Sequence, residues 1–104
     1  MASDKSYLDY VMEMLGDLDE ISFRAMMGEY VLYYKGKVFG GIYDNRFLVK
    51  NTNFSRGFMP NAQLELPYDG GKEMLLVENV DDKAFLSRLV DGMYDDLPML
   101  KKRK

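Results

Sequence analysis

The stretch FRAMMGEYVLYYKGKVFGGIYDNRFLVK, residues 23–50, decides the fold of this chain of 104 residues. Apolar and aromatic residues crowd positions 23–27, 31–34, 38–43 and 47–49. The dipeptides Lys35-Gly36 and Asp44-Asn45 between them can adopt the positive φ that tight hairpin turns require. Because such short turns join antiparallel strands, the stretch predicts an antiparallel meander.

Alternation along these strands predicts which side chains face the core. In 23–27 we expect the odd positions to face inward, with Arg24 and Met26 facing away: Phe23, Ala25 and Met27. The next strand is apolar on both faces, which predicts that helices, a partner chain or a ligand cover each face at least in part. Gly40-Gly41 inside a strand predicts a bulge or a close backbone approach.

Helical patterns flank the strands. Ser3 or Asp4 is expected to cap a first helix that runs to about Leu15, and Asp81 or Asp82 a last helix that Pro98 limits. Between them we expect a helical turn at 53–58, an edge strand at 63–66 and a central strand at 73–80. The sum predicts an α+β fold: a single antiparallel sheet of about five to six strands, flanked by an N-terminal and a C-terminal helix. This domain would span residues 1–100, followed by a basic tail at 101–104.

The composition narrows the chemistry. The chain contains neither cysteine nor histidine, which excludes a disulfide, a thiol nucleophile and a histidine ligand for a metal. The acidic pairs fall at predicted helix ends or turns, where capping and solvation account for them. We therefore expect a protein that is not an enzyme and that needs no cofactor or metal.

Charge bears on the expected partners. The net charge is −3, and removing the four positive charges of Lys101–Lys104 leaves −7. Such an acidic body is a poor binder of nucleic acid, because that affinity rests on clustered Lys and Arg. The sequence also has no apolar run long enough to cross a bilayer and no pattern of a signal peptide, so we expect a cytoplasmic protein without membrane contact.

Several side chains are candidates for contact with a ligand or partner. The basic ones come from separate strands or strand ends and can converge on an anion: Arg24, Arg46, Lys50 and Lys72. Salt bridges to Glu29, Glu65 or Asp44 on the sheet surface are the favoured explanation for them. Met27 and Tyr30 are candidate partner contacts, because nine methionines favour an adaptable apolar surface and tyrosines often fill an interface. A self-association surface, and hence a homodimer, is expected on that basis.

Extended motifs carry a resemblance to a known family. They read Phe23-Arg24-x-Met26-Met27-Gly28-Glu29-Tyr30, Tyr33-Tyr34-x-Gly36-Lys37, Gly41-Ile42-Tyr43-Asp44, Arg46-x-Leu48-Val49-Lys50 and Pro67-Tyr68-x-Gly70-x-Lys72-x-Met74-Leu75. With these motifs the chain resembles the N-terminal domain of the TfoX/Sxy family, bacterial proteins named for regulators of competence for DNA uptake. The resemblance implies an α+β domain similar to secretion-chaperone-like folds and is compatible with a homodimer. It departs from the R-x-M-F-G-G pattern of competence regulators at Met27 and Glu29.

Our leading hypothesis is a non-enzymatic regulatory or protein-interaction domain with an unknown protein partner. A nucleic-acid-binding accessory protein is the first alternative, with Lys101–Lys104 as the contact. A binder of a small anionic ligand is the second alternative. Its pocket would bring together Arg24, Tyr30, Lys50 and Lys72.

Overall fold

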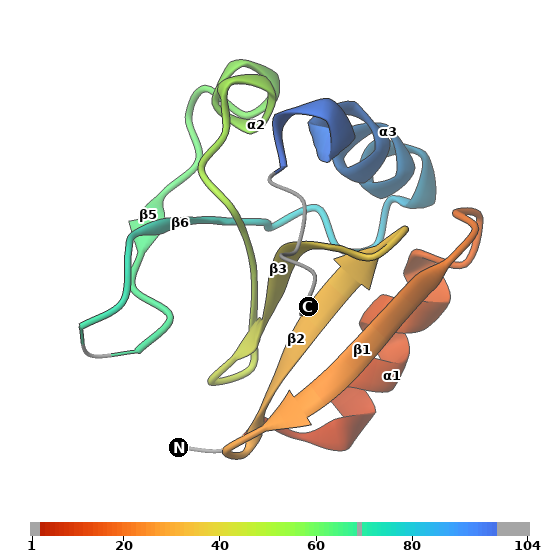
Figure 1. Ribbon diagram of the computed structural model, residues 1–104, viewed down its shortest axis with the longest axis vertical. Coiled ribbons are helices and arrows are strands. Elements are labelled where there is room, and N and C mark those ends of the chain that lie inside the picture. Colours follow the sequence, from red (N-terminus) through yellow and green to blue (C-terminus); the bar gives the residue numbers. More distant parts are fainter. Residues whose placement is uncertain (1–2, 69, 98–104) are drawn as a thin grey trace, which may run out of the picture.

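The computed structural model describes residues 3–68 and 70–97, in which helices and strands form one α+β domain (Figure 1). In chain order the elements are α1 (Lys5–Met14), β1 (Ile21–Met26), β2 (Glu29–Tyr34), β3 (Lys37–Tyr43), β4 (Arg46–Val49), α2 (Asn53–Phe58), β5 (Leu64–Glu65), β6 (Met74–Leu76), α3 (Lys83–Met93) and the 3-10 helix η1 (Tyr94–Asp96). The predicted limit at Pro98 and the basic tail lie outside the described residues.

All strands belong to one antiparallel sheet in the order β1-β2-β3-β4-β6-β5. The predicted fold class is therefore confirmed, with helices at both ends of the chain. The turns at 35–36 and 44–45 have positive φ at both central residues, which matches the twist of the flanking strands. A third turn of this kind, at Met27 (φ 53°) and Gly28 (φ 85°), separates β1 from β2 and was not predicted.

The glycine pair in β3 confirms the predicted irregularity. The register between β2 and β3 shifts at Phe39, which is the extra residue of a bulge opposite Leu32 and Tyr33. The bulge lets Phe39 and Ile42 both face the helices, although their odd spacing would place them on opposite faces of a regular strand. A Cβ at Gly40 would lie 2.2 Å from the Leu48 carbonyl oxygen, so the strands approach too closely for a side chain.

The hydrophobic core lies on one face of the sheet, between the strands and the two long helices. Figure 1 shows α1 alongside the β1–β2 hairpin and α2 next to α3. The helices contribute Leu8, Val11, Leu15, Leu86, Leu89, Val90 and Met93 to the core, and the sheet contributes Leu32, Tyr34, Phe39, Ile42, Phe47, Val49 and Leu75. Both helices thus cover the same face, and no helix among residues 3–68 and 70–97 covers the other face.

The inward direction predicted for the first strand is right at Phe23 and Ala25, which lie opposite the helix-face residues Leu32 and Tyr30, but the predicted burial is wrong. Phe23 is 42% exposed, Ala25 is exposed and Met27 is 96% exposed, instead of lying in the core. The reason is that β1 is an edge strand with a neighbour on one side only, and that Met27 belongs to a turn. The predicted strand at 73–80 is likewise shorter, and only Met74–Leu76 pairs with its neighbours.

Caps fix the positions of the helices. The Asp82 side chain accepts a hydrogen bond from the Phe85 amide, as predicted, whereas the Asp4 side chain makes no such bond in α1. Thr52 and Ser55 form a capping box at α2, and the buried Ser55 hydroxyl also donates to the Lys50 carbonyl oxygen over 2.8 Å. That bond fixes the chain where it leaves β4. No helix among residues 3–68 and 70–97 is long and apolar enough for a membrane crossing.

Candidate functional site

The sheet face without a helix carries a groove of about 1070 Å³. It is bounded by the β1–β2 turn, by the loop between β5 and β6, and by the strands beneath them. The described lining residues are Met26, Met27, Glu29, Val31, Val38, Tyr43, Lys50, Asn51, Pro67, Tyr68, Gly70, Gly71, Lys72, Glu73 and Met74. The groove is therefore a depression built from three separate parts of the chain.

The floor of the groove is apolar because of strand alternation. Val31 and Tyr43 point away from the helices, on the opposite face from Leu32 and Ile42, and each is only 9% exposed. The Tyr43 ring meets the Tyr68 ring edge to face, with centroids 6.1 Å apart. Burial, followed by the nearby Tyr68, raises the pKa of Tyr43 above its ordinary value.

One wall of the groove is the β1–β2 turn. Met26 is 49% exposed and Met27 is 96% exposed, so two flexible apolar side chains stand at the rim. Glu29 anchors this corner, because its Oε1 accepts hydrogen bonds from the Ser3 hydroxyl over 2.5 Å and from the Asp44 amide over 3.1 Å. The carboxylate of Glu29 is thus engaged within the protein as well as lining the groove.

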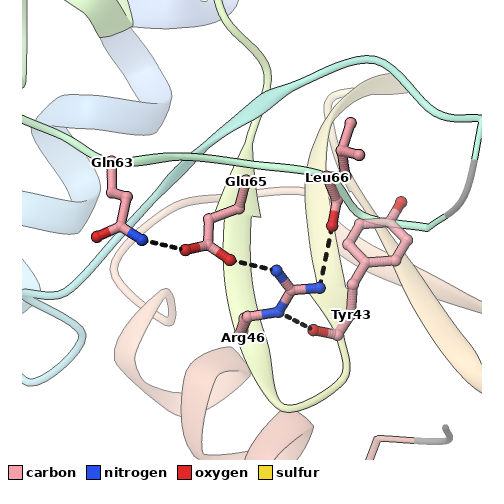
Figure 2. A network of polar contacts seen from close by, with 5 residues as sticks. All are labelled: Tyr43, Arg46, Gln63, Glu65 and Leu66. Carbon is pink, nitrogen blue, oxygen red and sulfur yellow. Dashed lines mark hydrogen bonds and ion pairs between the residues drawn. The ribbon is translucent and has the colours of Figure 1, made fainter.

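The opposite wall is the loop that follows β5, and a network of hydrogen bonds around Arg46 holds it in place (Figure 2). The Arg46 guanidinium donates to Glu65 Oε1 over 2.5 Å, to the Leu66 carbonyl oxygen over 3.1 Å and to the Tyr43 carbonyl oxygen over 3.1 Å. Gln63 donates to the other Glu65 oxygen over 2.6 Å. Arg46 therefore ties β5 and the start of the loop to the β3–β4 hairpin and positions this wall.

The structure brings some of the candidate residues together and separates others. Met27, Lys50 and Lys72 line the groove. Arg24 is opposite Val31 in the register and so shares the groove's face, but it lies on the edge strand outside the described lining. Tyr30 is on the helix face, where its ring meets the Phe23 ring at 5.8 Å.

The lining chemistry suits non-covalent recognition of an apolar group. Methionine, valine, proline and tyrosine side chains dominate, while two lysines and two glutamates offset one another in charge: Lys50, Lys72, Glu29 and Glu73. No cluster of acidic residues with the geometry of a metal site occurs among the residues that the structure describes. The sequence reasoning missed Val38 and Tyr68 as residues of this groove. The signal for Tyr68 was an aromatic residue directly after Pro67 in a loop.

Comparison with known proteins yields a family and one relative. The family model of the TfoX N-terminal domain matches residues 13–95. A Spirochaeta aurantia protein described as an "uncharacterized 12.7 kDa protein in trpE 5'region" is 37% identical over 84 residues, which cover 81% of this chain and 73% of that protein. No solved structure matches the chain.

Proposed function

The chain belongs to the TfoX N-terminal domain family, and on this premise we propose that it is a non-enzymatic regulatory domain whose helix-free groove binds an apolar segment of a partner protein. The observation that supports this most is the groove itself, with a buried apolar floor and two exposed methionines at its rim. A link to competence regulation and a cytoplasmic location stay predictions.

The open rim of the groove favours a protein segment over a small molecule. Pockets for small ligands commonly enclose roughly 300–1,000 Å³ and bury most of the ligand. This groove has a volume near the top of that range, about 1070 Å³, but the side chain at its rim, Met27, is 96% exposed. An extended or helical segment of a partner fills such an open depression better than a small anion does.

The methionines favour a partner that docks through apolar side chains. Met26, Met27 and Met74 line the groove, and methionine adapts its shape to different apolar surfaces. Lys50 and Lys72 lie among them and can pair with an acidic residue of the bound segment. We expect the charges of Lys50 and Lys72 to determine the orientation of the bound segment more than its binding affinity.

Affinity capture with a matched pair of variants tests this proposal. Tyr68→Asp places a charge in the groove, whereas Tyr10→Asp makes the same change at an exposed tyrosine on α1, away from the groove. We expect a protein recovered from host lysate with the wild type and Tyr10→Asp to be depleted at least tenfold with Tyr68→Asp. Equal recovery with both variants would contradict the proposal. Thermal unfolding checks that both variants fold.

Two further measurements distinguish a partner protein from a small molecule and from nucleic acid. Native mass spectrometry of protein purified from the host would show a bound small molecule as an added mass that Tyr68→Asp removes. That result would replace the protein segment with a small ligand. The nucleic-acid alternative instead predicts salt-sensitive binding that deletion of residues 101–104 weakens.

A further inference from the structure

Within the part of the chain that the structure describes, strand β1 (Ile21–Met26) leaves one long side of the sheet without a partner. It pairs with β2 on one side and ends the strand order on the other. The opposite edge is β5, which consists of Leu64–Glu65 alone. Since a short edge strand offers little backbone for pairing, β1 is the edge that can accept another strand.

The hydrogen-bond pattern determines which backbone groups of β1 point outward. The Lys35 amide donates to the Glu20 carbonyl oxygen over 3.0 Å, so Glu20 and Lys35 form a hydrogen-bonded pair. Bonded and non-bonded pairs alternate along an antiparallel ladder. The even residues of β1 therefore bond to β2, and the outward N–H and C=O groups belong to Ile21, Phe23 and Ala25.

This edge has only one of the usual features that prevent strand pairing, the charged side chain of Arg24. Natural sheet edges carry charged side chains, above all lysine, or proline, a bulge or a short strand. The segment ISFRAM contains no proline or lysine, and its register with β2 runs without a shift from Ile21 to Met26. Phe23, at its centre, is 42% exposed. The edge is thus long, regular and apolar at its middle.

We propose that β1 pairs with β1 of a second copy of this chain, antiparallel and centred on Phe23. In this register Phe23 faces Phe23 of the second copy, and Ile21 faces Ala25. Each of these pairs exchanges both of its backbone hydrogen bonds, so every outward group of β1 is satisfied. The contact is isologous and closes as a dimer.

Neighbouring registers are less favourable. In a two-fold symmetric pair of β1 strands, one residue of β1 faces the same residue of the second copy. Each possible register is therefore defined by that central residue, and the neighbouring registers are centred on Ser22 and Arg24. Centring on Arg24 would put two arginines directly opposite each other, which is destabilising. Centring on Ser22 would leave the outward groups of Ala25 beyond the end of the facing strand, because Glu20 turns away with φ 61°. The Phe23 register avoids both costs.

The proposed dimer does not use the groove, but it determines how the grooves of the two copies are arranged. A two-fold axis perpendicular to the joined sheet keeps both helix-free faces on one side. The dimer would therefore present two grooves on the same surface. Since the outward groups of β1 do not line the groove, loss of one function leaves the other testable.

Single-cysteine variants test the register, because the natural chain has no cysteine. In the proposed dimer the Cα atoms at position 23 are about 5.5 Å apart, within reach of a disulfide. Those at position 25 are offset by four residues, or about 13 Å. We expect Phe23→Cys to form a covalent dimer under mild oxidation, and Ala25→Cys to form no covalent dimer. Equal crosslinking of both variants, or none at position 23, would overturn the register.

Backbone-directed variants test the edge itself by sedimentation equilibrium. Ala25→Pro removes an outward N–H that β2 does not use, whereas Ala25→Thr keeps it. We expect the wild type and Ala25→Thr to associate to twice 12.1 kDa, and Ala25→Pro to raise the dissociation constant at least tenfold. A wild type that stays at 12.1 kDa at high concentration would overturn the proposal, as would equal association of the two variants. If Ala25→Pro does not fold, the cysteine pair still decides the question.

Discussion

Replacing Gly40 with alanine should destabilise the sheet at the point where β3 and β4 approach most closely. The added Cβ would lie 2.2 Å from the Leu48 carbonyl oxygen and 2.9 Å from the Val49 Cα. Ordinary contacts begin at 3.4 Å, so the strands must separate by about 1.2 Å, the difference between 3.4 and 2.2 Å. The obstructing atoms are backbone and cannot rotate away.

The cost follows from this separation. Overpacking costs about 1–3 kcal/mol, and weakening two ladder hydrogen bonds adds about 1 kcal/mol each. The bond from the Lys50 amide to the Phe39 carbonyl oxygen, now 2.8 Å, is among those affected. Alanine also lowers the conformational entropy of the unfolded chain, which offsets about 0.4–1 kcal/mol of this loss of stability. We therefore expect a net loss of about 3 kcal/mol, which is a large part of the stability of such a domain.

Urea denaturation followed by circular dichroism measures this loss, and the matched control is Gly57→Ala in α2. A Cβ at Gly57 meets no atom within 4 Å, so alanine there should stabilise the protein by about 0.5–1 kcal/mol. For a domain of this size the Gly40 variant should lower Tm by about 12 °C or more. A Gly40→Ala variant within about 0.5 kcal/mol of the wild type would refute the close approach of the two strands.

Three other changes separate structural roles. Burial raises the pKa of Tyr34 above 10.0 in the folded protein. The protonated Tyr34 side chain therefore contributes its full stabilisation below pH 10, and this contribution is lost as the pH rises further. Melting temperatures measured against pH should fall less steeply above pH 10 for Tyr34→Phe than for the wild type. Arg46→Ala should lower the free energy of unfolding by about 1–2 kcal/mol and speed hydrogen exchange at residues 63–66, because the side chains of the Arg46–Glu65 ion pair are only 27% and 20% exposed. The control is Lys5→Ala, which removes an ion pair with Asp9 whose side chains are 65% and 62% exposed. It should change the free energy of unfolding by less than about 0.5 kcal/mol. Ser55→Ala should cost about 1–2 kcal/mol in chemical denaturation, since it removes half of a buried capping box.

Much of the fold could be predicted because local signals decide it. Turn dipeptides such as Asp44-Asn45 and the apolar runs between them specify hairpins with little help from distant residues. The turn at Met27-Gly28 escaped prediction because methionine seldom adopts positive φ, so only Gly28 marked it. The error propagated: with the turn missed, Met27 was assigned to the core although it is almost fully exposed.

The candidate site was predicted only in part, because a groove depends on contacts between distant segments. Lys50 and Lys72 were correctly noted as basic residues at strand ends, but nothing local places them beside Tyr68. The exposure of β1 also follows from the strand order, in which it forms an edge. Alternation alone gives the two faces of a strand and does not tell which strand lies at the edge.

Photocrosslinking in the host cell tests the central claim, that the helix-free groove binds a partner protein. A benzophenone amino acid at position 68 replaces a tyrosine of the groove with a related aromatic ring, and the same residue at position 10 serves as the control on α1. Irradiation should link the position-68 protein to another protein, giving an adduct whose mass is not that of a second copy, while position 10 gives none. Adducts of equal yield at both positions, or none at position 68, would contradict the account.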